Sequence, residues 1–99
     1  METRLTWDEA KRAANLRKHG LDFADAGEVL HSRCRMDVRV HRGGEQRTLQ
    51  FSYALGFLAV LTVVHTERDG AARVISFRRA STAEREAYDA WLEDEFDDA

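Results

Sequence analysis

The sequence predicts a single α+β domain over residues 1–99, with helices at both ends and a four-stranded antiparallel sheet between them. Apolar residues recur at helical spacing before residue 32 and after residue 81, and they alternate with polar residues through much of 36–79. Gly-Gly and Asp-Gly pairs separate the alternating runs and leave only short connections. The expected order is therefore α-α-β-β-β-β-α, with the helices packed on one face of the sheet.

The first helix is predicted from a capping box in which Thr6 caps the first amides and Glu9 follows three residues later. It runs to about Lys18, and Gly20 is placed to end it in the left-handed conformation. A second helix is expected from Asp22 to near His31. Its apolar face consists of Phe23, Ala26, Val29 and Leu30.

Strands are predicted where the period changes to two. The first two predicted strands carry Met36, Val38 and Val40, then Leu49, Phe51 and Tyr53, with a turn at Gly43-Gly44. A second reversal is expected around Leu55-Gly56. Residues 57–66 are apolar on both faces, which is typical of a central strand, and Asp69-Gly70 turns the chain into a last strand over 72–79.

The final helix is predicted from a second capping box, Ser81-Thr82-Ala83-Glu84. Its expected buried stripe consists of Ala87, Tyr88, Trp91 and Leu92. The residues that follow, 93–99, hold five acids, and acids are unfavourable at a helix C-terminus because the helix dipole is already negative there. We therefore expect the last residues to fray.

The composition is that of a globular protein of the cytoplasm. Cys34 is the single cysteine, which excludes an internal disulfide and fits a reducing compartment. One cysteine and four scattered histidines offer no paired spacing for zinc, and we expect no metal or other cofactor. No apolar run is long enough to span a bilayer, and the N-terminus has no apolar signal segment.

The net charge of −3 conceals two regions of opposite sign. Residues 1–80 hold 14 basic and 10 acidic residues, a balance of +4, whereas residues 81–99 hold one basic and eight acidic residues, a balance of −7. Between 33 and 79 nine arginines face only four acids. This pattern suits a protein that binds a polyanion through a basic body, although a solvated mixed surface would also produce it.

Two motifs resemble those of a known family. The stretch "WDEAKRAANLRKHGLDFADA" resembles the N-terminal signature of the BrnT ribonuclease toxins, and "VVHTERDGAARVISFRRASTAEREAY" resembles the family's later R-x-I-S-x-R-x-A and E-R-x-x-Y pattern. The two stretches have the right order and spacing, and only residues 31–46 match weakly. Phe77 stands where a small residue is common and Ala72 where a branched one is, which we interpret as packing differences beside the motif.

This resemblance implies a RelE-like fold and the toxin of a type II toxin-antitoxin system. It implies an endoribonuclease that inhibits translation and growth, works without metal, and is neutralised by a cognate BrnA-like antitoxin in a hetero-oligomer. Contact with DNA would then be indirect, through the antitoxin, and no membrane partner is expected.

Metal-free RNA cleavage uses the 2′-hydroxyl as nucleophile, so it needs a proton acceptor, positive charge at the phosphate and a proton donor for the leaving oxygen. His19 is the natural candidate for proton transfer, because histidine titrates near neutrality. The alternative is that a charged His19 interacts with the carbonyls at the end of its helix. Glu67 and His65, at the end of the predicted central strand, are further candidates for a general base.

Charge at the phosphate is expected from arginines, whose fork matches phosphate oxygens. The catalytic candidates are Arg47, Arg73 and Arg78. Strict alternation places Arg73 and Arg79 on one face of the last strand and Ser76 and Arg78 on the other. Arg79 and Ser76 are expected to bind RNA, although Arg79 is also suited to an ion pair with the final helix. No Gly-x-Ser-x-Gly elbow surrounds Ser76, so it is not a covalent nucleophile.

On the first helix, Lys11, Asn15 and Lys18 share one narrow arc. The family match favours RNA contact for Lys11 and Lys18. For Asn15 we favour a structural role in which its amide ties the helix to a strand. The competing functions for the whole chain are a non-catalytic nucleic-acid-binding module and a protein-interaction module.

Overall fold

The computed structural model describes residues 4–53 and 59–96. The order of elements along the chain is β1 (Leu5–Thr6), α1 (Glu9–His19), the 3-10 turn η1 (Phe23–Asp25), α2 (Gly27–Leu30), β2 (Met36–Arg42), β3 (Glu45–Tyr53), β4 (Val60–Arg68), β5 (Ala71–Arg79) and α3 (Thr82–Phe96). The α+β prediction is confirmed in class, and the predicted reversal around Leu55-Gly56 lies outside the described residues. No helix among the described residues is long and apolar enough to cross a membrane.

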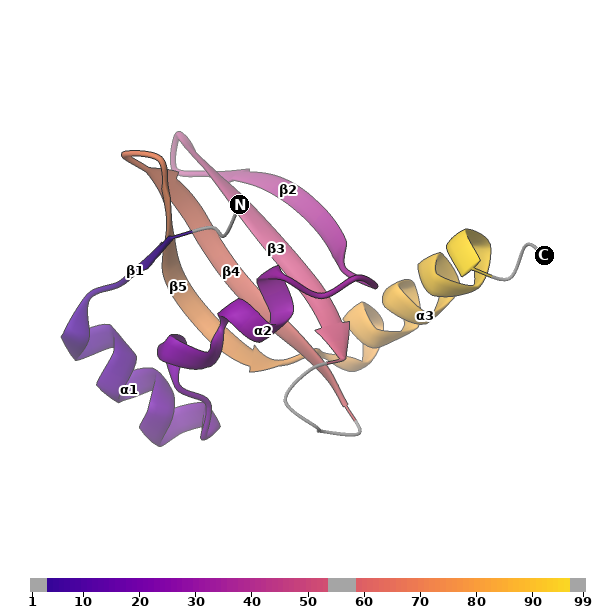
Figure 1. The fold of residues 1–99 in the computed structure, drawn as a ribbon, viewed down its shortest axis with the longest axis horizontal. Helices are drawn as coiled ribbons and strands as arrows, with labels where there is room; N and C mark the ends of the chain where they lie inside the picture. Colours follow the sequence, from indigo (N-terminus) through magenta and orange to yellow (C-terminus); the bar gives the residue numbers. More distant parts are fainter. Residues whose placement is uncertain (1–3, 54–58, 97–99) are drawn as a thin grey trace.

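The sheet has five strands in the order β1-β5-β4-β3-β2 (Figure 1). The four predicted strands form its antiparallel part, and β4 is central, as its two apolar faces predict. The prediction of a four-stranded, wholly antiparallel sheet is wrong in one respect, because β1 adds a parallel strand beside β5 with Leu5 opposite Ala72 and Thr6 opposite Arg73. A two-residue strand carries no periodic signal, so the sequence pattern could not reveal it.

The N-cap of the first helix lies two residues later than predicted. Asp8, and not Thr6, is the N-cap: its carboxylate accepts a hydrogen bond from the amide of Lys11 at 3.1 Å. Thr6 is committed to β1, so the predicted capping box does not form. The helix ends as expected, with Gly20 at a φ of 71° and its amide bonded to the carbonyl of Leu16.

The predicted second helix is divided into η1 and α2. Asp22 caps η1 by accepting a hydrogen bond from the amide of Ala24 at 3.0 Å, and His31 is the C-cap of α2. The predicted apolar face is confirmed, because all four of its members are buried: Phe23, Ala26, Val29 and Leu30. They pack with Leu61, Val63, Ala72, Val74 and Phe77 of the sheet to form the larger core.

Helices cover both faces of the sheet, which corrects the prediction that they share one face. The elements α1, η1 and α2 pack on the face that carries Leu61 and Val63 (Figure 1). Tyr88 of α3 is buried against Phe51 and Val60, which point to the opposite face because neighbours along a strand alternate. Trp91 and Leu92 also pack there as predicted, but Ala87 of the expected stripe is exposed.

α3 covers only one end of that second face, and the rest of the helix projects away from the sheet (Figure 1). The Tyr88 hydroxyl donates to the Cys34 carbonyl at 2.7 Å, and its ring meets that of Tyr53 edge-on with centroids 5.8 Å apart. The helix is thus anchored by its middle turns. Among the described residues, no helix therefore covers the face carrying Phe51 over the half of the sheet nearer the β2–β3 and β4–β5 turns.

Candidate active site

A small cavity of about 260 Å³ lies between α1 and β5. Its lining brings together four residues that the sequence assigned to catalysis or RNA binding, Lys11, Lys18, His19 and Ser76, along with Ala14, Asn15 and Ile75. Five of these seven residues lie on one helix and two on one strand, so the cavity depends on how α1 is held against β5.

Asn15 holds the two elements together. Its Nδ2 donates to the carbonyls of Phe77, at 2.8 Å, and Leu21, at 3.0 Å, while its Oδ1 accepts from the amide of Phe77 at 3.1 Å. The buried amide thus satisfies both backbone groups of Phe77 at the edge of β5, beyond the point where β1 pairs. The predicted structural role of Asn15 is confirmed, and it places Lys11 and Lys18, one turn to either side, beside the strand.

A β-bulge in β5 decides which arginines share a face. Val64 is opposite Ser76 and His65 is opposite Val74, so Ile75 has no partner residue on β4. Because of this extra residue, Arg73, Ser76 and Arg78 lie opposite Thr66, Val64 and Thr62, which all point to one face of β4.

The prediction from strict alternation is therefore wrong for Arg73, whereas it is correct in separating Ser76 and Arg78 from Arg79. Arg73 shares a face with Ser76 and Arg78, and Arg79, opposite Leu61, points to the face that α1 and α2 cover. The extra residue changes the parity of the strand between Arg73 and Ser76. Since a bulge depends on how two strands pair, alternation along one of them cannot predict it.

Arg47 of β3 belongs to the same face. Val64 is opposite Leu49, and Arg47 lies two residues from Leu49 along the strand, so both point the same way. A cross-strand row of apolar residues, Val38, Leu49 and Val64, separates Arg78 from Arg47 and Arg73 on this face. We call this uncovered surface, with Arg47, Arg73, Ser76 and Arg78, the arginine face.

His19 links the cavity on α1 to the arginine face. Burial lowers the pKa of His19 below its usual value, and the positive charges of Lys18 and Arg78 lower it further. A histidine whose main role was to meet helix carbonyls in its charged form would have a raised pKa instead. The environment therefore favours neutral imidazole, the form that can accept a proton.

Arg78 is fixed by an ion pair with Glu84 at the start of α3. Its Nη1 donates to Oε1 of Glu84 at 2.7 Å and its Nη2 donates to Oε2 at 3.0 Å. The predicted capping box forms here, since Ser81 Oγ accepts from the Glu84 amide and Glu84 Oε1 accepts from the Ser81 amide. This second role of Glu84 was not predicted, because the capping-box pattern alone accounts for a glutamate at this position.

A comparison of this sequence with models of protein families covers the same residues. A family model for BrnT, described as the ribonuclease toxin of a type II toxin-antitoxin system, matches residues 7–84. The chain belongs to this family. The match extends from Trp7, before α1, to Glu84, so it includes every residue of the cavity and of the arginine face. Among curated proteins, none matches the chain at a significant level.

Membership of the family accounts for the expected ribonuclease and for an antitoxin as partner. Two predicted site residues nevertheless lie apart from the others. Glu67 is exposed and opposite Ala72, so it points away from the arginine face, and it lines a separate polar cavity with Gly44, Glu45, Gln46, Thr48 and Thr66. Arg79 points to the same side as Leu61, as described above.

His65, the other candidate base on β4, is held inside the sheet. Its Nε2 lies 2.9 Å from Oε1 of Gln50, and burial lowers its pKa. It is opposite Thr48 and Val74 and shares the face of Val63, away from Arg73 and Arg78. We assign it a structural role.

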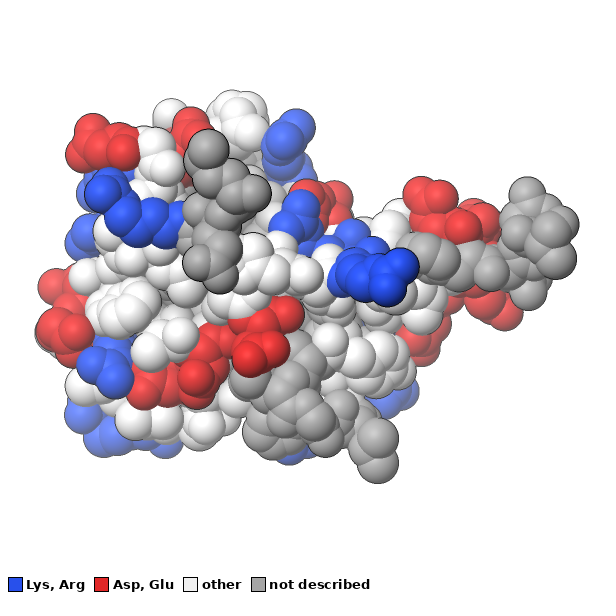
Figure 2. Space-filling view, in the orientation of Figure 1, with Lys and Arg blue, Asp and Glu red and all other residues white. Residues whose placement is uncertain are grey.

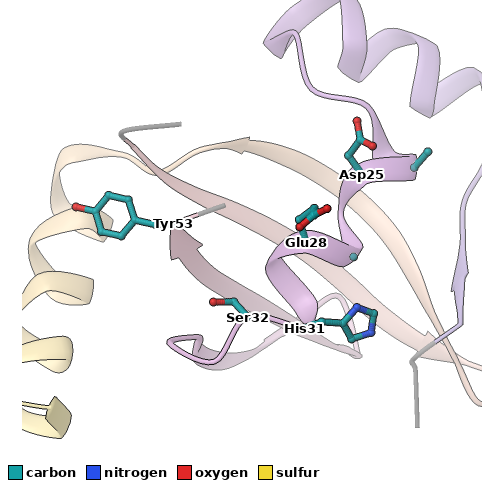
Figure 3. A pocket seen from close by; sticks show the side chains of 7 residues that line it. Asp25, Glu28, His31, Ser32 and Tyr53 are labelled. Carbon is teal, nitrogen blue, oxygen red and sulfur yellow. The ribbon is translucent and has the colours of Figure 1, made fainter. Parts of the chain in front are cut away.

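A larger cavity, of about 500 Å³, lies beside α2 (Figure 3). Asp25, Glu28, His31, Ser32 and Tyr53 line it together with Ala24 and Gly27. Figure 2 shows acidic side chains over this part of the molecule and along the projecting part of α3. Since two carboxylates border this cavity, a phosphate is better accommodated on the arginine face. Within the described ranges, no three His, Cys, Asp or Glu side chains are grouped as metal ligands would be.

Proposed function

We propose that this toxin cleaves RNA by attack of a ribose 2′-hydroxyl on the adjacent phosphate, at the junction of the α1 cavity and the arginine face. The observation that carries the proposal is that His19 lies close enough to Arg78 to feel its charge, in surroundings that favour the neutral imidazole. Lys11, Lys18 and Ser76 line the same cavity as His19, which supports a role for them in binding phosphate beside the proposed proton acceptor.

In the proposed reaction, neutral His19 accepts the 2′-hydroxyl proton while the oxygen attacks phosphorus. The bond from phosphorus to the 5′-oxygen breaks, and that oxygen takes a proton from an acid, leaving a 2′,3′-cyclic phosphate and a 5′-hydroxyl. Arg78 and, across the apolar row of the same face, Arg73 stabilise the charge on the pentavalent phosphate, with Arg47 on the side of Arg73. The proton acceptor and the charge-stabilising groups proposed here are side chains, so we propose that the reaction proceeds without a metal.

We further propose that Lys11, Lys18 and Ser76 bind phosphates flanking the scissile one. Glu67 and Arg79 point away from the arginine face, so we give them no part in stabilising the scissile phosphate. In the cell, such cleavage would stop translation and growth in the cytoplasm. A BrnA-like antitoxin, bound in a hetero-oligomer, would restrain it and would carry any contact with DNA.

The test is cleavage of a single-stranded RNA by the purified protein in the presence of EDTA. We expect cyclic-phosphate products from the wild type and none from His19→Ala. His41→Ala is the matched control, because His41 is an exposed histidine on β2 that faces away from the arginines. RNA binding without cleavage by the wild type would instead support the alternative, a non-catalytic binding module.

The two arginines of β5 give a second test. We expect Arg73→Ala and Arg78→Ala each to slow cleavage by roughly a hundredfold or more, the usual cost of losing one positioned stabilising group, without loss of the fold. Circular dichroism checks the fold and single-turnover cleavage measures the rate. A variant that cleaves at the wild-type rate removes its arginine from the mechanism.

A further inference from the structure

The ion pair between Arg78 and Glu84 leaves one edge of the guanidinium open. Glu84 takes Nη1 and Nη2, at 2.7 and 3.0 Å, and Nη1 also donates to the Arg79 carbonyl at 3.3 Å. Nε–H and the second Nη2–H have no partner among the described residues. These two donors are parallel and match the spacing of two oxygens on one phosphate.

Glu84 is itself held rigidly. Its Oε1 accepts from the Ser81 amide at 2.8 Å, its own amide donates to Ser81 Oγ at 3.2 Å, and its side chain is only 22% exposed. Both carboxylate oxygens are therefore engaged, and a change of rotamer would break the N-terminal cap of α3. A glutamate fixed in this way is suited to orient its arginine and does not need to be displaced by substrate.

The charge state of the pair is stable across the neutral range. Hydrogen bonding to Arg78 lowers the pKa of Glu84, with a further contribution from the Ser81 amide. Glu84 thus stays ionised at neutral pH. Its function at neutral pH is electrostatic and geometric.

We propose that Glu84 is a positioning residue for RNA cleavage: it binds the end of the Arg78 guanidinium and presents the open Nε–Nη2 edge toward the α1 cavity and the scissile phosphate. This inference rests on the proposed function. It extends the functional unit from α1 and the sheet to the first turn of α3. One carboxylate thus both caps α3 and positions Arg78, and Ser81 contributes only to the cap.

The test compares Glu84→Gln with Ser81→Ala. Glutamine can still accept from the Ser81 amide but cannot form the charge-assisted pair, whereas Ser81→Ala removes the cap from the Glu84 amide and leaves the pair intact. We expect Glu84→Gln to lower kcat about tenfold to a hundredfold with little change in KM, since small displacements of a catalytic group have costs of this order. We expect Ser81→Ala to lower Tm by roughly a few degrees and to leave kcat unchanged.

A double-mutant cycle and a measurement without substrate complete the test. If Glu84 acts through Arg78, then Arg78→Ala/Glu84→Gln cleaves no more slowly than Arg78→Ala. In the free protein, the NMR order parameter of the Arg78 Nε–H bond should fall in Glu84→Gln. An unchanged order parameter, an additive double mutant or an equal loss of kcat in Ser81→Ala would overturn the proposal.

Faster cleavage or tighter RNA binding by Glu84→Gln would also overturn it, because that result would make Glu84 a competitor of the phosphate. Failure of the proposed function is distinguishable from all of these outcomes. In that case the wild type does not cleave RNA, or Arg78→Ala cleaves normally, while the order parameter still reports whether Glu84 holds Arg78.

Discussion

At the scale of single residues, His19 is the group whose environment makes the most specific prediction. Burial, Lys18 and Arg78 all lower its pKa, so in NMR titration His19 should titrate below about 6.5, the usual value for histidine. Lys18→Met removes one positive charge and should raise the pKa. Loss of a signal in His19→Gln assigns the imidazole resonance of His19. A His19 pKa that stays constant or falls in Lys18→Met would contradict the conclusion that the charge of Lys18 lowers it.

Four residues that line the cavity between α1 and β5 were candidates from the sequence, whereas the arrangement of the candidates was not predictable. Lys11, Asn15 and Lys18 share an arc because helical spacing is fixed by local geometry, and the structural role of Asn15 follows from the poor fit of an amide inside a helix. The side to which Arg73 points depends on the unpaired Ile75, which is set by the pairing of two strands. The ion pair of Arg78 with Glu84 was not predicted, because the capping-box pattern alone accounts for a glutamate at position 84.

At the scale of elements, the strands and turns were predictable because their signals are local. Asp69 and Gly70 both have positive φ, 55° and 77°, as an Asp-Gly hairpin turn requires. β1 was missed because its two residues are held by the edge of β5 and not by any pattern of their own. Asn15 binds the backbone of Phe77 further along the same edge. The short strand and one helix side chain therefore share the task of satisfying the backbone groups of this edge.

The pair that fixes α1 to η1 makes this part of the fold sensitive to acid. Arg12 binds Asp22 through Nε and Nη2 at 2.7 and 2.9 Å, and these hydrogen bonds lower the pKa of Asp22 to about 2. Because the folded-state pKa lies below the unfolded one, the stabilisation is present above the usual pKa of aspartate, near 3.8, and is lost as the pH falls toward 2.

Asp22→Asn should therefore lower Tm at pH 7 by roughly a few degrees, and the difference from the wild type should shrink as the pH approaches 2. Asparagine can still cap η1, so the variant tests the ion pair alone. Asp25→Asn is the matched control, because Asp25 is exposed. A Tm difference that persists at pH 2 would assign the effect to the cap or to packing.

At the scale of the whole molecule, three arginines of the sheet and the acidic residues of the projecting helix occupy different regions. Arg47, Arg73 and Arg78 share the uncovered face of the sheet, while acidic side chains lie along the projecting part of α3 (Figure 2). If RNA binds this face through its phosphates, the affinity should fall by roughly one power of salt concentration for each phosphate contact. Fluorescence anisotropy with catalytically inactive His19→Ala measures the slope, and a flat dependence would indicate a protein as the main ligand of the face.

The acidic end of α3 allows a second whole-molecule prediction. The described acids at this end, Glu93, Asp94 and Glu95, are exposed, and the last turn of α3 holds no basic residue to offset the helix dipole. A tail could serve the toxin by screening its arginines from RNA, by contacting a basic segment of the antitoxin, or by maintaining solubility. The helix projects away from the sheet, which places these three residues away from the arginine face (Figure 1).

We therefore expect deletion of residues 93–99 to leave RNA affinity unchanged at low salt, where screening between charges is weakest and any competition by the tail is strongest. This variant retains Trp91 and Leu92, which pack against the buried cluster of Phe51, Val60 and Tyr88, so the fold should persist. Anisotropy titrations at low and high salt provide the measurement. Tighter RNA binding by the truncated protein at low salt, with the difference vanishing at high salt, would show instead that the tail competes with RNA. Equal RNA binding combined with a weaker complex with the antitoxin would assign the acidic end to the partner.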